Sequence, residues 1–492
     1  MDVAANLEQL FFAIVARATA VWPTVAAVAD LLIAIVASAH VILHKRDVRA
    51  AIGWAGLVWL VPFLGALLYW LLGINRIRRR AARLDRPLAV VRESRRVYAA
   101  GSNRGGDAPL APLVELVARA TGSPLLPGNL VTPFVDGVEA YPAMLEEIAN
   151  ARRSILFTTY IFDHDRAGTL FLDALAAARR RGVEVRVLID GVGARYSRPR
   201  MTRLLASRGV PVAEFLTPTV PLPNPYFNLR NHRKILVVDG RRAFTGGMNV
   251  REGCLLDLVP PPRHPIRDLH FAFDGPVVEQ IFAAGAVDWH FATGERLAGE
   301  AWALDTAPAG AVEARAIPVG PDEDFETLGT TILGALAVAR RRVSIVTPYF
   351  LPDSVVISAL RLAALRGVRV DIVLPEHSNL RFVEWASMAQ LPQVIGDDCW
   401  VWLSPPPFDH SKLMVVDGEW SLVGTANWDA RSLRLNFEID VECYDPTLAA
   451  ALDELVERRI EASRLLRCEE IEARPLPIRL RDNLARLFTP YL

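Results

Sequence analysis

The stretch NHRKILVVDGRRAFTGGMN, residues 231–249, is followed later in the chain by a second stretch of the same design, DHSKLMVVDGEWSLVGTAN, residues 409–427. Both contain His-x-Lys, then four residues, an Asp, six residues, a Gly and, three positions further on, an Asn. Chance is a poor explanation for fixed positions that recur at identical spacing in one chain of 492 residues. The repetition therefore predicts two copies of one structural unit.

Each copy has a direct physical interpretation. The His and the Lys are two residues apart, so on a strand they point to the same face of the sheet. Four apolar residues then form a buried strand, and Asp-Gly marks a tight hairpin turn that returns the chain to the Gly-x-x-Asn. The Asp is an odd number of residues from the His and the Lys, so we expect it to brace the turn outside their pocket.

The polar side chains of the two copies suit a phosphate anion. Each copy contributes one imidazole, one ammonium and one carboxamide, and two such sets facing each other would place histidines on opposite sides of one phosphorus. Near neutral pH an imidazole can either attack phosphorus or supply a proton to the leaving alkoxide. The two sets are His232, Lys234 and Asn249 in the first copy, and His410, Lys412 and Asn427 in the second.

Four segments resemble one known family. They are NLRNHRKILVVDG at 228–240, DWHFATGE at 288–295, TPYFLPD at 347–353 and RSLRLNFEI at 431–439. In these segments, and over nearly its whole length, the chain is similar to the bacterial cardiolipin synthases of the phospholipase D superfamily, whose signature is this His-Lys-Asp motif. The departures are Gly247 and Thr425, where the family often has Ser, and the Pro405–Pro407 run before the second motif.

The resemblance implies a reaction route and a set of catalytic residues. The family works through a covalent phosphohistidine, with the second histidine as general acid and then base. By the family's usual preference for the N-terminal copy, His232 is the nucleophile and His410 the acid and base, and the lysines and asparagines hold the non-bridging oxygens. No metal or other cofactor is needed. The catalytic set implied by the signature is His232, Lys234, Asp239, His410, Lys412 and Asp417, with Asn249 and Asn427 binding phosphate.

Two carboxylates stand at the family positions that orient the histidines. A nucleophilic His works best when a third group fixes its tautomer. We assign Asp268, in RDLHFAFDG, to His232, and Glu438, in NFE, to His410. The alternative for both carboxylates is an ordinary structural ion pair.

Two further side chains lie next to the motifs in the sequence. Arg233 is interpreted either as a contact for a lipid head group or as a plain surface residue. Tyr349, in TPYF, is expected near the pocket, with a place in the core as the alternative.

Residues 1–80 predict a membrane region. The apolar stretches 24–43 and 50–73 are each about 20 residues or longer, enough to cross a hydrocarbon core of about 30 Å. Two long spans joined by a short polar loop favour a two-helix transmembrane hairpin over a cleaved signal peptide or a buried core hairpin. Asp30 in the first span fits a place against the second span, against another subunit or near the interface.

Basic residues predict the orientation of this hairpin, because the more basic side of a membrane protein is normally cytoplasmic. The flank after the second span has a denser cluster of basic residues than the connecting loop. Both termini and the catalytic region are therefore expected in the cytoplasm, in a multi-pass protein of the inner (cytoplasmic) membrane. The loop carries Lys45, Arg46 and Arg49, and the flank carries Arg76, Arg78, Arg79, Arg80 and Arg83.

The rest of the chain divides into four parts. We expect a linker at 81–128, a first phospholipase D-like repeat at 129–305, a second at 306–470 and an amphipathic tail at 471–492. Leucines at helical spacing in the tail fit either a helix on the membrane surface or a helix docked on the domain.

The two repeats have the same predicted order of elements. Each begins with a buried strand, at 154–160 or 344–349, continues with a helix and returns in a second strand. Strands that alternate with helices predict an α/β fold with a mixed sheet. The two phospholipase D-like repeats would form an internal pseudo-dimer, so that one site is built from both halves.

The composition limits the alternatives. The net charge is zero, which gives no reason to expect a nucleic-acid partner, and the four cysteines have neither metal-site nor disulfide spacing. The leading reading is a membrane-bound phosphatidyltransferase that makes cardiolipin and glycerol from two phosphatidylglycerol molecules, with membrane lipids as its partners. The alternatives are a phospholipid hydrolase, a less favoured nuclease, and a non-enzymatic scaffold that the two intact motifs disfavour. The chain is compatible with an oligomer.

Overall fold

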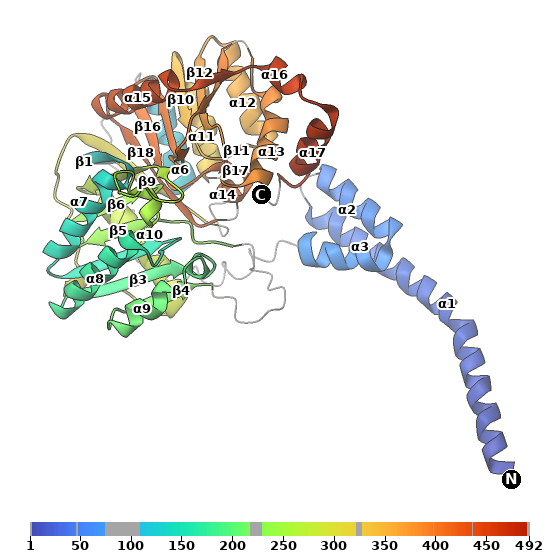
Figure 1. The fold of residues 1–492 in the computed structure, drawn as a ribbon. Helices are drawn as coiled ribbons and strands as arrows, with labels where there is room; N and C mark the ends of the chain where they lie inside the picture. The colour runs from blue at the N-terminus through green and yellow to red at the C-terminus, as the bar shows by residue number, and fades with distance from the viewer. Residues whose placement is uncertain are drawn as a thin grey trace. The chain divides into compact units, whose positions relative to one another are not determined.

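The computed structural model describes residues 2–45, 48–73, 109–216, 229–320, 327–396, 398–434 and 436–489. The chain divides into two compact units, residues 1–79 and 80–492 (Figure 1). The predicted basic flank at 76–83 and Arg46 of the connecting loop lie outside the described residues.

The N-terminal unit contains one helix that is long and apolar enough to cross a membrane. Helix α1 (Asp2–His44) includes the apolar segment Thr19–His44, in which Asp30 is partly buried. The second predicted span is interrupted, because α2 (Val48–Leu60) ends before Pro62, and α3 (Pro62–Leu68) and the π-helical turn Tyr69–Gly73 follow. Proline lacks the N–H that a continuous helix needs. The predicted two-helix transmembrane hairpin is therefore not confirmed. The described residues confirm one helix that is long and apolar enough to cross a membrane.

The second unit is built on a mixed sheet of fifteen strands within the described ranges. Its order is β19-β13-β12-β10-β15-β16-β18-β9-β1-β8-β6-β5-β2-β3-β4. The first-repeat strands are β1 (Leu126–Val135), β2 (Ser154–Thr159), β3 (Glu184–Asp190), β4 (Val212–Phe215), β5 (Ile235–Val238), β6 (Arg242–Gly246) and β8 (Leu269–Asp274). The second-repeat strands are β9 (Val312–Val319), β10 (Arg342–Val346), β12 (Arg369–Pro375), β13 (Cys399–Ser404), β15 (Leu413–Val416), β16 (Trp420–Gly424), β18 (Glu438–Tyr444) and β19 (Arg464–Leu466).

The strand order confirms the predicted repeat. Read outward from the central β1–β9 pair, both halves follow the same course, and the motif hairpins β5–β6 and β15–β16 are equivalent. Each hairpin pairs next with a strand that has an acid at its start, Asp268 just before β8 and Glu438 as the first residue of β18. Gly246 is opposite His270 of β8, and Gly424 is opposite Asp440 of β18. This register makes Asp268 and Glu438 equivalent positions in the two repeats.

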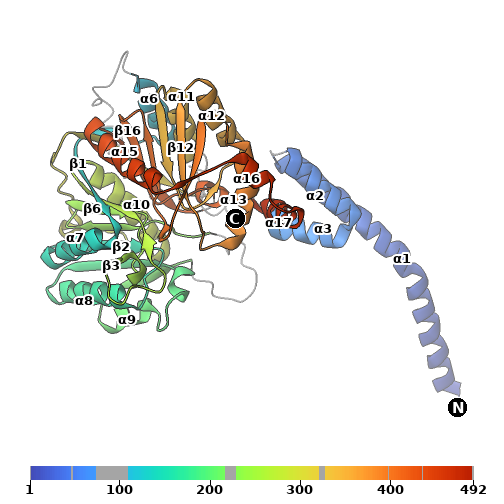
Figure 2. The ribbon, with the colours of Figure 1, turned by 45° about the horizontal axis from the view of Figure 1, so that its top comes forward.

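Helices cover both faces of the sheet (Figures 1 and 2). In the first repeat α7 and α8 pack on one face and α10 on the other, while in the second repeat α11 and α12 lie opposite α15. The core under α10 and α15 contains buried residues of both repeats, which joins them in one hydrophobic cluster. The bounds are α7 (Asp136–Asn150), α8 (Arg166–Arg180), α9 (Met201–Ser207), α10 (Val277–Thr293), α11 (Thr327–Val338), α12 (Ser354–Leu365) and α15 (Pro446–Glu461).

Local sequence signals set the ends of the equivalent helices α8 and α12. The Asp165 carboxylate accepts a hydrogen bond from the backbone N–H of Gly168, and Asp353 does the same for Val355 and Val356. Such caps satisfy donors that have no partner inside the helix. Past the other ends, Gly182 and Gly367 adopt positive φ angles of 92° and 82°, which suit glycine.

Part of the predicted linker belongs to the folded core. Residues 74–108 lie outside the described residues, but α6 (Ala111–Thr121) buries Leu113 and Val117 in the same cluster as Ile332 and Leu336 of α11. Other short elements are β7 (Ile266–Arg267), β11 (Phe350–Leu351), β14 (Phe408–Asp409), β17 (Trp428–Asp429), α13 (Arg381–Gln390), α14 (Ala430–Arg434), α16 (Cys468–Glu472) and α17 (Leu476–Arg486).

Candidate active site

The two motif histidines meet where the repeats join. The His232 and His410 rings have centroids 6.5 Å apart, with their planes at 76°. Backbone bonds across the repeats hold them there: the His232 N–H donates to the Phe437 carbonyl at 2.9 Å, and the His410 N–H donates to the Arg267 carbonyl at 2.7 Å. Each histidine is therefore fixed beside the acid-bearing strand of the opposite repeat.

Each imidazole pairs with the carboxylate of the other repeat. His232 Nδ1 lies 2.9 Å from Glu438 Oε2, and His410 Nδ1 lies 2.8 Å from Asp268 Oδ2. The predicted pairing of Asp268 with His232, and of Glu438 with His410, is wrong. The physical reason is that the backbone N–H of each histidine bonds to the carbonyl of the residue just before the other repeat's acid. Each imidazole therefore lies beside that acid.

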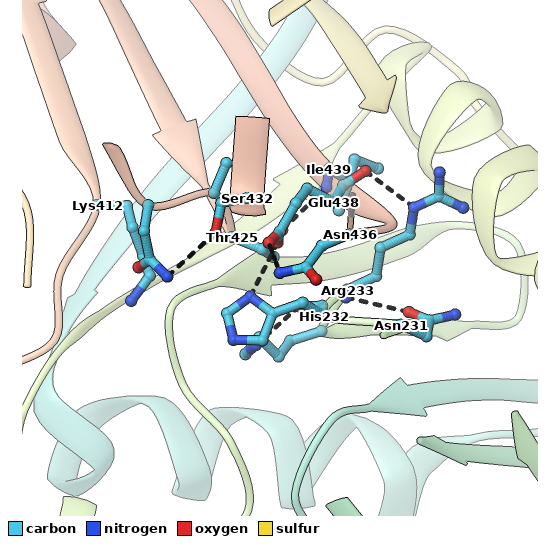
Figure 3. Close-up of polar contacts among 12 residues, drawn as sticks. Asn231, His232, Arg233, Lys412, Thr425, Ser432, Asn436, Glu438 and Ile439 are labelled. Carbon is cyan, nitrogen blue, oxygen red and sulfur yellow. Dashed lines mark hydrogen bonds and ion pairs between the residues drawn. The ribbon is translucent and has the colours of Figure 1, made fainter. Parts of the chain in front are cut away.

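The two acids differ in the side chains that support them. Glu438 also accepts hydrogen bonds from Thr425 Oγ1 at 2.7 Å and from Asn436 Nδ2 at 3.0 Å (Figure 3). The equivalent of Thr425 is Gly247, which has no hydroxyl to donate. A Cβ at Gly247 would lie 2.0 Å from Asp268 Oδ1, so this glycine leaves the space that Asp268 occupies. Asp268 accepts instead from the Leu269 N–H at 2.8 Å.

This difference agrees with the acidities of the two carboxyl groups. Burial opposes the ionisation of Glu438, but the neighbouring His232 and Lys234 and the Thr425 hydroxyl outweigh it and hold its pKa below the ordinary value. Burial raises the pKa of Asp268 to about 8, although the Lys412 ammonium opposes this. Near neutral pH, the first pair therefore contains a carboxylate and the second retains a proton on its acid.

Burial also lowers the pKa of both imidazoles. The pKa of His232 falls to about 4, with Glu438 opposing the shift and Lys234 adding to it. That of His410 falls well below its ordinary value, because burial is reinforced by the two motif lysines. A neutral imidazole that donates Nδ1–H to a carboxylate has its lone pair on Nε2, where it can attack phosphorus.

The lysines are buried next to their histidines. Lys234 Nζ donates to the His232 carbonyl at 2.7 Å, and Lys412 Nζ lies 2.9 Å from His410 Nδ1. Burial lowers their pKa values to about 7 and about 8. Each shares a cavity of about 10 Å³ with the asparagine of its own motif, Asn249 or Asn427. These asparagines are anchored in turn, by the Ile161 N–H at 3.0 Å and by Ser432 Oγ at 3.2 Å.

The motif aspartates stand apart from this group. The Asp239 carboxylate accepts from the backbone N–H groups of Arg152, Arg153 and Ser154 at 2.7–3.0 Å, and the residue has a φ of 54° in its turn. Asp417 accepts in the same way from the N–H groups of residues 340–342 at 2.7–2.9 Å. Both therefore brace a turn, as expected from the spacing, and their inclusion in the catalytic set is not supported by a contact with either histidine.

Comparison with known proteins decides the family. The family described as "Cardiolipin synthase, PLD-like domain" matches residues 144–256 and 332–460, and "Phospholipase_D-nuclease N-terminal" matches 32–73. The chain is 31% identical to "Major cardiolipin synthase ClsA" of Bacillus subtilis, over 91% of this chain and 95% of that one. It is 32% identical to "Cardiolipin synthase A" of Pseudomonas fluorescens, over 93% and 95%. The chain belongs to the cardiolipin synthase family of the phospholipase D superfamily.

A solved structure supports the fold alone. The phosphatidylserine synthase of Haemophilus influenzae superposes with a TM-score of 0.54 and 16% identity, covering 77% of this chain and 100% of that one. This member of the cardiolipin synthase family is a phosphatidyltransferase of the phospholipase D superfamily. Its single chain contains both phospholipase D-like repeats.

Both alternatives for Arg233 are wrong. Its guanidinium is buried, pairs with Asp288 of α10 at 2.6 Å and donates to the Glu438 carbonyl at 2.9 Å. In the second repeat a different residue makes a comparable link: Asp409, which stands where Asn231 stands in the first motif, pairs with Arg459 of α15 at 2.8 Å. These pairs tie each motif to a helix. Both pairs join residues far apart in the sequence, and local spacing does not indicate either of them.

Two tyrosines flank the histidines. Tyr160 lies edge-on to His232 with ring centroids 5.1 Å apart, and Tyr349 lies 6.4 Å from His410. Tyr349 is where the sequence predicted it. Tyr160 was missed; it directly follows β2 and, when the repeats are aligned, stands one position before the place of Tyr349, so a comparison of the repeated strand ends could have indicated it. The Pro405–Pro407 run connects β13 to β14, the strand that leads to His410.

Proposed function

We propose that this protein is a membrane-bound phosphatidyltransferase that makes cardiolipin and glycerol from two phosphatidylglycerol molecules. The observation that carries the proposal is the pair of facing imidazoles, each hydrogen-bonded to a carboxyl group of the opposite repeat. The names of the relatives support the product. A phosphodiester resists nucleophiles, so its transfer needs a nucleophile on one side and a proton donor on the other.

In the first step, His232 Nε2 attacks phosphorus and the bond to the glycerol oxygen breaks. The departing alkoxide takes a proton from the His410–Asp268 pair and leaves as glycerol. The phosphatidyl group remains on His232 as a phosphoramidate. Glu438 stabilises the positive charge that develops on the His232 ring, since its carboxylate accepts the Nδ1–H.

In the second step, a hydroxyl of the second phosphatidylglycerol gives its proton to the His410–Asp268 pair. Its oxygen attacks phosphorus, the bond to His232 Nε2 breaks, and cardiolipin leaves. The pair has recovered the proton that it lost in the first step, so the cycle closes without a cofactor.

Four side chains would hold the non-bridging oxygens. The two lysines and two asparagines of the motifs supply ammonium and amide donors, and such donors act more strongly in a buried site than in water. They are Lys234, Lys412, Asn249 and Asn427, all of which are buried.

The membrane topology remains part of the proposal. The apolar helix α1 supports insertion, and the broken segment from α2 to Gly73 would complete a second crossing. Both termini and the catalytic unit would then lie in the cytoplasm, on the side of the denser basic flank. The protein would be a multi-pass enzyme of the inner (cytoplasmic) membrane.

The test is product analysis with the purified full chain in phosphatidylglycerol vesicles. We expect cardiolipin and glycerol in equal amounts with little phosphatidic acid. His232→Ala and His410→Ala should each abolish both products, while His290→Ala, in α10 and bonded to the Glu295 carbonyl, should retain them. Phosphatidic acid as the main product would replace the transferase with a phospholipid hydrolase.

A further inference from the structure

Helix α17 presents a row of leucines to solvent. Leu476, Leu480, Leu484 and Leu487 are 66%, 62%, 60% and 71% exposed. Their spacing of three or four residues places them along one side of the helix. We call these four residues the leucine ridge. Four neighbouring exposed leucines require an explanation, since soluble surfaces rarely gather large apolar side chains in one patch.

The opposite side of α17 packs against α13, so the leucine ridge faces away from the domain (Figures 1 and 2). Ala485 is buried against Ala386 and Leu351, and the Arg481 guanidinium lies 4.2 Å from the centre of the Trp385 ring. The tail is therefore a docked helix, as one predicted alternative had it, and its apolar side nevertheless faces outward.

The ridge connects with the rim of the active site. Tyr349 lies 6.4 Å from His410 between ring centroids and donates a hydrogen bond to Asn379 Oδ1 at 2.7 Å. Exposed apolar residues continue from there: Leu380, and then Phe382, whose ring is 5.7 Å from that of Phe488, two residues past the end of α17. An apolar surface thus extends from beside the second histidine to the leucine ridge.

The charge of this segment favours an anionic surface. Residues 474–488 contain four arginines and one aspartate, a net charge of +3. Two of the arginines, Arg474 and Arg481, pair with Asp482, and Arg479 is exposed beside the ridge. A helix with leucines on one side and arginines beside them is suited to the interface of a bilayer that contains anionic lipid.

We propose that the leucine ridge inserts into the surface of the anionic bilayer that holds the substrate, and so keeps the mouth of the active site at the lipid head groups. The occupant is the lipid surface, not a second protein. The proposal rests on the proposed function only for its consequence for turnover; the insertion itself is independent of the reaction.

Insertion is tested by a fluorescent label in the full chain, reconstituted in phosphatidylglycerol vesicles. Cys468 is replaced by Ser, because the other three cysteines are buried and unreactive. A bimane is then placed at Leu480→Cys, with Leu170→Cys in α8, which is 53% exposed, as the matched control. We expect brominated phosphatidylglycerol to quench the label at 480 at least twofold more than the label at 170. Equal quenching, or label-to-label contact between two chains at 480, would overturn the proposal.

The consequence for turnover is tested with two forms of phosphatidylglycerol. Leu480→Glu/Leu484→Glu should lower turnover of vesicle lipid about tenfold but leave turnover of a short-chain monomeric phosphatidylglycerol unchanged, and Leu170→Glu should affect neither. An equal loss on both substrates would indicate a folding defect and contradict the ridge. If the unmodified chain makes no cardiolipin from either substrate, the proposed function fails, while the quenching result still decides insertion.

Discussion

His232 and Glu438 lie 206 residues apart in the sequence and meet at 2.9 Å, Nδ1 to Oε2, across the boundary between the two repeats. His410 and Asp268 repeat the relationship in the opposite direction at 2.8 Å. Neither repeat alone therefore contains a histidine with its supporting acid. A complete site requires both halves in the observed arrangement.

This crossed pairing predicts which substitutions behave alike. Phosphatidyl-p-nitrophenol carries a leaving group that needs no proton, so it should restore the first step in His410→Ala and Asp268→Asn. It should not restore that step in His232→Ala or Glu438→Gln. With phosphatidylglycerol we expect His410→Ala and Asp268→Asn to lose ~10²–10⁴-fold or more, the usual contribution of proton transfer, and the other two variants to lose the covalent step. The measurement is the burst of nitrophenolate; a burst in Glu438→Gln but not in Asp268→Asn would mean that the pairing is not crossed.

The unequal support of the two acids predicts opposite requirements at Thr425 and Gly247. Thr425→Ala removes a donor to the Glu438 carboxylate, worth about 1.5 kcal/mol, and should slow turnover about tenfold, while Thr425→Ser should retain activity. Gly247→Ala should cost about 10²-fold, because its Cβ displaces Asp268 from His410. The control is Gly329→Ala, where a Cβ meets nothing within 4 Å. Normal turnover in Gly247→Ala would show that the position of Asp268 is unimportant.

The turn-bracing role of Asp239 predicts a loss of stability and not of chemistry. Asp239→Ala removes the acceptor for three backbone N–H groups and should lower the free energy of unfolding by about 2 kcal/mol or more. Asp239→Asn keeps one acceptor oxygen and tolerates the positive φ, so its loss should be smaller. Thermal unfolding in detergent measures both, and kcat at low temperature should stay within about threefold of the original. If the melting temperature is unchanged and kcat falls ~10²-fold, Asp239 is instead a catalytic residue.

Sequence patterns predicted what depends on local spacing, and missed what depends on the meeting of distant strands. The motif hairpins, the turn role of Asp239 and Asp417 and the equivalence of the repeats follow from periodicity and turn chemistry. The partner of each histidine does not, since Asp268 and Glu438 occupy equivalent positions and only the packing of the repeats selects between them. Pro62 indicated an interruption of the second predicted span. The residues on both sides of it are apolar, so hydropathy alone predicted one continuous helix.

The acidities predict how the first step depends on pH. The raised pKa of Asp268, about 8, means that its carboxyl keeps a proton below that pH and loses it above. Lys412, with a pKa of about 8, loses its charge over the same range. The single-turnover rate should therefore be level from about pH 5, where His232 is already neutral, and fall as pH rises, first through about 7, where Lys234 loses its charge, and then through about 8. A rate that rises through pH 8 would contradict the assignment of the proton to the His410–Asp268 pair.

The phosphatidyl-histidine itself is the most direct test of the two-histidine account. In His410→Ala, phosphatidyl-p-nitrophenol should form the intermediate, which then persists because the second step lacks its base. After an alkaline quench that preserves phosphoramidates, proteolysis and mass spectrometry should find one phosphatidyl group per chain, on the peptide that contains His232. A full burst of nitrophenolate with no adduct on His232 would contradict the account, as would an adduct on His410 in the His232→Ala variant.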